Sequence, residues 1–150
     1  MTSVHKVPES VLVVIHTPAL DVLLLERSDH PGFWQSVTGS LDYPGEDLRR
    51  ACAREVAEET GLGAAPERFD DWHVEHRYEI YSEWRHRYAP GVTHNTEHVF
   101  GLRVPGRYSP QLAPREHRAF RWLSWRDAAD ACFSWTNAAA VRELAQRARS

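Results

Sequence analysis

The sequence is poor in cysteine and contains no long apolar run. Its two cysteines, Cys52 and Cys132, form neither a disulfide framework nor the spacing of a zinc site, which argues against a small disulfide-bonded secreted domain. No apolar stretch approaches the roughly 20 residues that a membrane-spanning helix needs. We therefore expect a soluble protein of the cytoplasm, where thiols stay reduced.

The sequence also has no large excess of positive or negative charge, since the 150 residues carry a net charge of −3. A mildly acidic chain does not attract nucleic acid or an anionic membrane surface, so neither is an expected partner. The net charge does not exclude a phosphate ligand, because a metal ion or local basic residues can make the potential at a site positive. The length, without repeats or low-complexity tracts, predicts one domain over residues 1–150. The sequence leaves the oligomeric state open.

Strand and turn signals surround one internal helix, and two helices follow at the end. β-Branched and apolar runs predict strands at 11–16, 22–26, 33–38, 72–79, 81–87, 97–104 and 119–122. Helical spacing of apolar residues predicts helices at 47–60, 125–132 and 137–149. Glycine and proline mark a loop at 39–46. This order predicts an α/β protein with a mixed sheet between helical layers.

The helix expected at 47–60 carries three carboxylates, Glu55, Glu58 and Glu59, at positions i, i+3 and i+4. Counted from Leu48 at about 100° per residue, Glu55 and Glu59 fall about 20° on either side of it. Both therefore lie in the middle of the apolar face, with Glu58 at its edge. Buried unpaired carboxylates cost several kcal/mol and raise one another's pKa. The chain needs a countercharge here, and a divalent cation is the simplest one.

From Gly39 to Leu62 the sequence resembles the Nudix signature. That signature is a glycine, five residues, a glutamate, seven residues and then Arg-Glu, an aliphatic residue, any residue, Glu-Glu, any residue, glycine and an aliphatic residue. Here Glu46 is followed by seven residues and then REVAEETGL at 54–62, which fits throughout. Six residues instead of five separate Gly39 from Glu46, with the extra one around 43–44. The role of Gly39 therefore depends on how this loop folds.

Further segments are similar to the bacterial dihydroneopterin triphosphate pyrophosphohydrolases, the branch of this family in folate biosynthesis. These segments are FWQSVTGS at 33–40, HRYAPGVTHNTE at 86–97, EH at 116–117 and SWTN at 134–137. The resemblance implies a Nudix fold, with a mixed sheet between helices. It also implies Mg²⁺-dependent hydrolysis of 7,8-dihydroneopterin triphosphate to the monophosphate and pyrophosphate.

The acidic helix supplies the expected metal ligands. Hard carboxylate oxygens suit Mg²⁺, which Mn²⁺ can replace, and a bound ion lowers the pKa of its water. We expect Glu55 and Glu59 to be direct ligands because both point inward. Glu58 is a candidate catalytic residue that holds a second ion or acts through water. By family resemblance, the Gly39 carbonyl is a further ligand.

Three other charged residues have a functional and a structural interpretation. The resemblance assigns Arg54 a catalytic role, an ion pair that orients a glutamate; the alternative is a surface pair with Glu58 worth under about 1 kcal/mol. Glu116 matches a family glutamate that approaches the metal as ligand or general base, and the alternative is a solvated loop acid. Glu46 is expected near the helix N-terminus, where it pairs with an arginine at 49–50 or takes part in catalysis.

Substrate contacts are expected from several separate segments. Candidate phosphate ligands are Arg27, Arg87, Arg85 and His94, although a strand-end arginine is more often solvated. A pterin ring needs aromatic stacking partners and amide-like hydrogen bonds. The candidates are Phe33, Trp34, Tyr88 and Trp135 for stacking and Asn95 and Asn137 for the ring edge.

Two alternative functions remain open. A pterin and a purine present similar ring edges, so the same chemistry on a (deoxy)nucleoside triphosphate, such as dATP or oxidised dGTP, is a close alternative. A catalytically silent Nudix ligand sensor is the second, and it would be expected to lose signature acids that this chain keeps. In each case the expected partner is a small molecule, a triphosphate if the protein is an enzyme.

Overall fold

Seven strands, three α-helices and two 3-10 helices make up residues 5–149, the part of the chain that this computed structural model describes. The strands are β1 (Glu9–His16), β2 (Asp21–Arg27), β3 (Trp34–Gln35), β4 (Val37–Ser40), β5 (Asp70–Glu79), β6 (His94–Arg103) and β7 (His117–Ser124). The helices are α1 (Leu48–Thr60), η1 (Pro66–Arg68), η2 (Ser82–Arg87), α2 (Trp125–Ala131) and α3 (Trp135–Ala148).

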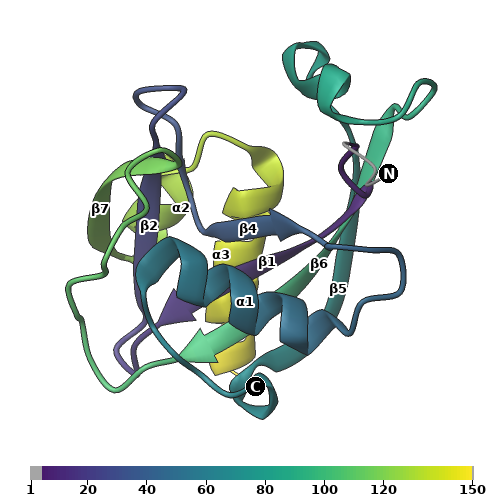
Figure 1. Ribbon diagram of the computed structural model, residues 1–150. Helices are drawn as coiled ribbons and strands as arrows, with labels where there is room; N and C mark the ends of the chain where they lie inside the picture. Colours follow the sequence, from purple (N-terminus) through teal and green to yellow (C-terminus); the bar gives the residue numbers. More distant parts are fainter. Residues whose placement is uncertain (1–4, 150) are drawn as a thin grey trace.

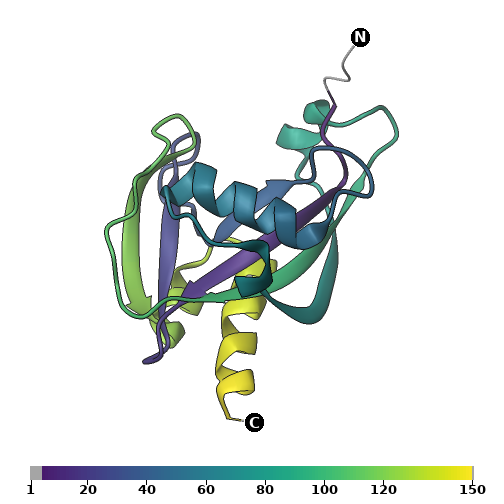
Figure 2. The same cartoon turned by 60° about the horizontal axis from the view of Figure 1, so that its bottom comes forward.

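The strands form one mixed sheet in the order β3-β2-β1-β6-β5, with β4 paired to β1 and β7 paired to β2. The two central strands, β1 and β6, are parallel, and the other pairs are antiparallel. Helices α1 and α3 cover opposite faces of the sheet (Figures 1 and 2). The predicted fold class, a mixed sheet between helices, is confirmed.

Residues of β1 alternate between two hydrophobic cores. Val11 and Val13 pack with Val56 of α1 on one face, whereas Leu12 and Val14 belong to the core under α2 and α3. Since helices cover both faces, β1 is apolar at every position from 11 to 15 and not only at alternate ones. Within residues 5–149, no helix is long and apolar enough to cross a membrane.

Helix α1 has well-defined ends that set its rotational phase. The Asp47 carboxylate accepts the backbone N–H of Arg50 at 3.3 Å, and Gly61 closes the other end with φ +76°, a value that favours glycine. Between these caps Ala51, Cys52 and Val56 face the sheet. The inward stripe predicted from the sequence is confirmed.

The strand predicted at 81–87 is wrong, because residues Ser82–Arg87 form η2. Its turns close locally, with hydrogen bonds of 2.9 Å from Trp84 N–H to the Tyr81 carbonyl and 3.0 Å from Tyr88 N–H to Arg85. The segment lacks the alternating apolar positions that would hold a strand against a core. It instead forms a compact projection beside the chain that leads into β1 (Figure 2).

The single strand predicted at 33–38 is two short strands. β3 pairs with β2, whereas β4 pairs with β1. Ser36 separates them, because its backbone N–H is bound at 2.9 Å by the side-chain oxygen of Asn137 and not by a neighbouring strand. The other predicted strands and helices are present, with slightly different ends.

Candidate active site

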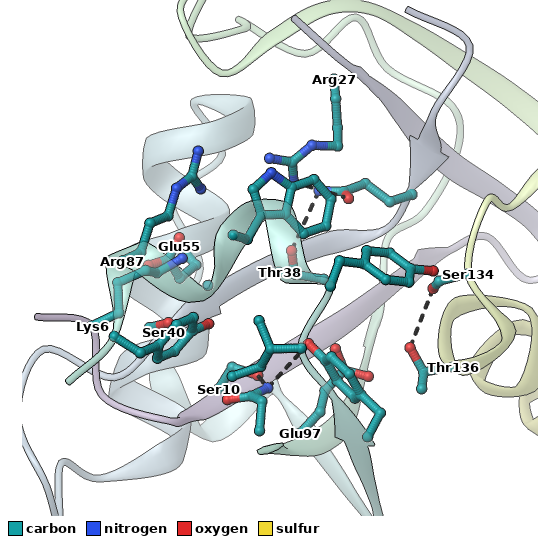
Figure 3. Close-up of a pocket in the computed structure, with 18 of the residues that line it drawn as sticks. Lys6, Ser10, Arg27, Thr38, Ser40, Glu55, Arg87, Glu97, Ser134 and Thr136 are labelled. Atoms are coloured by element: carbon teal, nitrogen blue, oxygen red, sulfur yellow. Dashed lines mark hydrogen bonds between the residues drawn. The ribbon is translucent and has the colours of Figure 1, made fainter. Parts of the chain in front are cut away.

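A cavity of about 1120 Å³ opens between α1, the η2 projection and the N-terminus of α3 (Figure 3). Most of the predicted site residues line it, although they come from separate parts of the sequence. They are Arg27, Gly39, Arg54, Glu55, Glu58, Glu59, Arg85, Arg87, Tyr88, Asn95, Glu116, Trp135 and Asn137.

Phe33 and Trp34 are placed wrongly by the sequence prediction, since neither lines the cavity. The Phe33 ring is stacked between His30 and Phe133, with centroid distances of 4.6 and 4.5 Å. Trp34 packs against the core under α2 and α3 and lies 4.7 Å from the guanidinium of Arg121. The Phe33 ring therefore stacks on other side chains of the protein, and Trp34 is held by the core and by Arg121.

Glu55 and Glu59 form a buried acid pair, with 8% and 2% of their surface exposed, while Glu58 is exposed at the edge. This confirms the orientations predicted from the helix phase. Burial raises the pKa of both buried carboxyls, and the neighbouring Glu55 raises that of Glu59 still further. Among the described residues, Oε1 of Glu59 has no hydrogen-bond partner. Glu59 therefore lacks a countercharge of its own among these residues.

Gly39 provides the space that the Glu55 carboxyl occupies. It lies opposite Val11 in the β1–β4 pair, and a Cβ atom at this position would overlap the carboxyl group. Its φ is not positive, so the requirement for glycine here is steric. A methyl group at position 39 would therefore displace Glu55.

The extra residue between Gly39 and Glu46 is accommodated in an outward turn. The Glu46 N–H binds the Tyr43 carbonyl at 3.2 Å, and Gly45 has φ +86°, as expected for a type II turn with Pro44 before it. Tyr43 at the start of this turn is exposed. The extra residue therefore lies on the solvent side of the loop, and Gly39 lies beneath α1, next to Glu55.

Arg54 joins three carboxylates around the acid pair. Its guanidinium lies 2.6 Å from Glu55, 3.0 Å from Glu46 and 3.0 Å from Asp42. The alternative of a surface pair with Glu58 is wrong, because within residues 5–149 this guanidinium pairs with Glu55, Glu46 and Asp42 and not with Glu58. Arg54 thereby holds the Glu55 carboxylate in a defined orientation.

The predicted pairing of Glu46 with an arginine at 49–50 is also wrong. Glu46 precedes the N-cap of α1 and is held by the loop, where it accepts the Asp42 N–H at 2.7 Å and pairs with Arg54. Arg49 instead donates to the Phe69 carbonyl at 3.0 Å. Glu46 thus supports Arg54 from outside the helix.

His117, the first residue of β7, is a site residue that the sequence analysis missed. It is 4% exposed, with Nε2 at 3.8 Å from Glu59 Oε1 and 3.3 Å from Gln35 Nε2. Burial lowers the pKa of His117 to about 4, so the ring is neutral near pH 7. The only sequence signal for His117 is the pair EH at 116–117, and the prediction assigned a role to the exposed Glu116 alone.

Lys6, Arg27 and Arg87 are among the cations that line the cavity near the η2 projection. Lys6 lies at the mouth, where the surrounding protein lowers its pKa and the charges of Arg87 and Arg27 lower it further. Arg27 holds Asp29 through two hydrogen bonds of 2.8 Å and lies 4.7 Å from the Trp84 ring. Mutual repulsion of these cations favours an anionic ligand. Lys6 carried no sequence signal; its backbone N–H binds the Arg87 carbonyl at 2.8 Å.

The two predicted amides have different surroundings. The Asn137 side chain accepts the Ser36 N–H and donates to Ser134 Oγ, each at 2.9 Å, so it is engaged in holding α3 to the sheet. Asn95 is 1% exposed and, among the described residues, its amide oxygen has no partner. Asn95 is therefore better placed to bind a ligand than Asn137.

Two predicted aromatic residues lie on the cavity wall. The Tyr88 ring lies 5.9 Å from Lys6 Nζ, on the side of the cations. Trp135, at the start of α3, is 61% exposed, and its ring centroid lies 5.3 Å from that of His76. An exposed tryptophan at a cavity wall offers a stacking face to a flat ring.

A family model described as NUDIX domain matches residues 6–146. The chain belongs to the Nudix family. Dihydroneopterin triphosphate diphosphatase of Escherichia coli K12 is 43% identical to it over 144 residues, which cover 94% of each chain. The Haemophilus influenzae protein of that name is 37% identical over 142 residues, 93% of this chain and 88% of the relative. The structure of the E. coli dihydroneopterin triphosphate pyrophosphohydrolase matches with a TM-score of 0.85 and 42% identity, covering 94% of this chain and 97% of that one.

Nudix hydrolases generally use divalent metal ions, and the acid pair fits one. Its donors are hard oxygens, and Glu59 Oε1 is buried without a partner among the described residues. Within residues 5–149, no three His, Cys, Asp or Glu side chains already converge on one ion position. Glu58 and Glu116 line the same cavity and stay predicted ligands of this Nudix site.

Without a bound metal ion, the free energy of unfolding should depend on pH because the carboxyls of Glu55 and Glu59 titrate differently in the folded and unfolded states. A carboxyl whose pKa is raised by folding binds a proton more tightly in the folded state, so stability falls as pH rises above the ordinary carboxyl pKa. Without divalent ions, we expect the Tm of the wild type to fall relative to that of Glu59→Gln by a few °C between about pH 5 and about pH 8. Added Mg²⁺ at the higher pH should raise the Tm of the wild type and not of the variant. Identical pH profiles for the two proteins would contradict this prediction.

Proposed function

We propose that this Nudix protein hydrolyses 7,8-dihydroneopterin triphosphate to the monophosphate and pyrophosphate, with Mg²⁺ as cofactor. The observation that carries the proposal is one cavity that brings the buried acid pair of α1 together with Lys6, Arg27 and Arg87 and with a polar, aromatic-lined end. The substrate class is supported by the relatives of that activity, which match the chain over nearly its whole length.

The chain's own charged groups have separate roles in this reaction. Lys6, Arg27 and Arg87 bind the triphosphate oxygens and offset their charge. Glu55 and Glu59 hold the metal, with the Gly39 carbonyl, Glu58 and Glu116 as the further proposed ligands. When bound, Mg²⁺ neutralises phosphate charge and lowers the pKa of a coordinated water.

Proton transfer and positioning complete the mechanism. Water adds to phosphorus as the phosphoanhydride bond to the leaving group breaks, and a carboxylate takes the proton that the water loses. Glu58 and Glu116 are the candidates for this general base, since both line the cavity and are exposed. Arg54 acts as a positioning residue through its 2.6 Å contact with Glu55.

A substrate panel tests the proposal. Pyrophosphate release is measured with Mg²⁺ on dihydroneopterin triphosphate, dATP and 8-oxo-dGTP, and kcat/KM is compared. We expect the pterin substrate to be preferred by at least about tenfold, because only one ring type satisfies all the polar groups of a built site. Chelation of the metal should abolish turnover, and Mn²⁺ should restore part of it.

Two results would contradict the proposal in different ways. A clear preference for dATP would assign the cavity to a nucleoside triphosphate. Release of no pyrophosphate from any of the triphosphates, with Mg²⁺ present, would support a ligand sensor on a Nudix fold.

A further inference from the structure

Glu97 of β6 is a third buried carboxylate in the cavity wall, and the acid pair does not account for it. It is 2% exposed and lies between Ser10 of β1 and His76 of β5 in the sheet register. Two residues further along, β1 and β6 present Leu12 and Val99 to the core under α3. The same face of the sheet therefore changes from apolar to polar where the strands enter the cavity.

This polar row contains two oxygen atoms without partners among the described residues. One is Glu97 Oε1, whose nearest basic atom, His76 Nδ1, is 3.7 Å away and beyond hydrogen-bond reach. The other is Oδ1 of Asn95, whose Nδ2 donates to Ser10 at 2.8 Å and to Tyr78 at 3.1 Å. Burying an acceptor without a donor is costly, so both oxygens call for donors on a ligand.

The chemistry of a carboxylate selects the kind of ligand edge. It accepts two parallel N–H groups when they lie side by side, as in a guanidinium fork. The 2-amino-4-oxo pyrimidine ring of a pterin, like that of guanine, presents such a pair in its 2-amino group and adjacent ring N–H. Adenine does not, because the ring nitrogen beside its amino group is an acceptor.

We propose that Glu97 determines substrate specificity by accepting the 2-amino and ring N–H groups of the pterin, while the Asn95 oxygen accepts a further donor of the ring. This inference rests on the proposed function of the same cavity. In Figure 3, Glu97 and Ser10 lie on the opposite side of the view from Arg27, so the ring and the triphosphate occupy different ends. Trp135 also lines the cavity, and its ring lies beside that of His76, the residue next to Glu97. Trp135 therefore offers the stacking face at the Glu97 end.

A comparison of dGTP with dITP, which lacks only the 2-amino group, tests Glu97 directly. Both are measured as competitive inhibitors of dihydroneopterin triphosphate hydrolysis. In the wild type, Ki should be at least about tenfold lower for dGTP than for dITP, since dITP leaves part of the carboxylate unpaired. In Glu97→Gln the ratio should approach one. KM for the pterin substrate should rise at least about tenfold with a smaller change in kcat.

The matched control is Glu75→Gln, an exposed glutamate of β5 outside the cavity, which should behave as wild type. Equal Ki values for dGTP and dITP in the wild type would overturn the inference without any variant, so a folding defect cannot hide the result. An unchanged ratio in a folded Glu97→Gln would also overturn it. If the wild type hydrolyses no dihydroneopterin triphosphate, the proposed function fails, and Kd values of dGTP and dITP still test Glu97.

Discussion

Replacement of Glu59 by glutamine is expected to lower kcat for pyrophosphate release by at least about a thousandfold, and Glu55→Gln should do the same. Both carboxylates face the cavity from the buried side of α1, and Glu59 Oε1 has no partner among residues 5–149. An amide of equal size supplies no negative charge to a divalent ion. The loss should therefore appear in turnover, which is measured by pyrophosphate release at saturating substrate and Mg²⁺.

The fold should survive both substitutions. Burial raises the pKa of each carboxyl, so the ionised forms are unfavourable in the metal-free protein, and a neutral amide relieves this penalty. The Tm near pH 7 without metal should equal or exceed that of the wild type. Glu67→Gln, at an exposed glutamate of η1, is the matched control for loss of one charge. Near-wild-type turnover in both site variants would remove the acid pair from the mechanism.

Gly39→Ala is expected to reduce kcat on the order of a hundredfold with little loss of stability. The added Cβ overlaps the Glu55 carboxyl, which is the flexible tip of a side chain. The tip therefore moves while the backbone of β4 stays, since the φ of Gly39 is not positive. A displacement of about 1 Å in a group that positions reacting atoms is enough for an effect of this size.

Two measurements separate a site effect from a folding effect in this variant. The Tm of Gly39→Ala should stay within a few °C of the wild type while kcat falls. Gly63→Ala is the control, because an added Cβ there meets no atom within 4 Å and φ is again not positive. Wild-type turnover in Gly39→Ala, or a large fall in Tm, would contradict the steric role.

The acid pair shows what a single element allows one to predict. Glu55, Glu58 and Glu59 take their relative directions from the geometry of one helix, and the structure buries the first and third and exposes the second. The Nudix resemblance added the expected chemistry and most of the cavity residues. The sequence also shows that the loop after Gly39 is one residue longer than in the Nudix signature, and in the structure this loop forms an outward turn.

Several errors and omissions in the site concern contacts between distant segments. Phe33 and Trp34 were expected in the site because of their type and neighbourhood, but other side chains cover them. Lys6 and His117 carry no distinguishing local pattern. They join the site only because the chain before β1 meets η2 and because β7 begins beside Gln35.

The fold class and the direction of the acids on α1 follow from the amino-acid pattern, because helix periodicity and strand patterns are local properties. Which residues face these acids across the cavity depends instead on tertiary packing. The parallel pairing of β1 with β6 brings Ser10 beside Glu97 across more than half the chain, and the position of α3 sets Trp135 near them. Such neighbours follow from strand register and helix docking, which depend on the packing of the whole core and not on the spacing of residues along the chain.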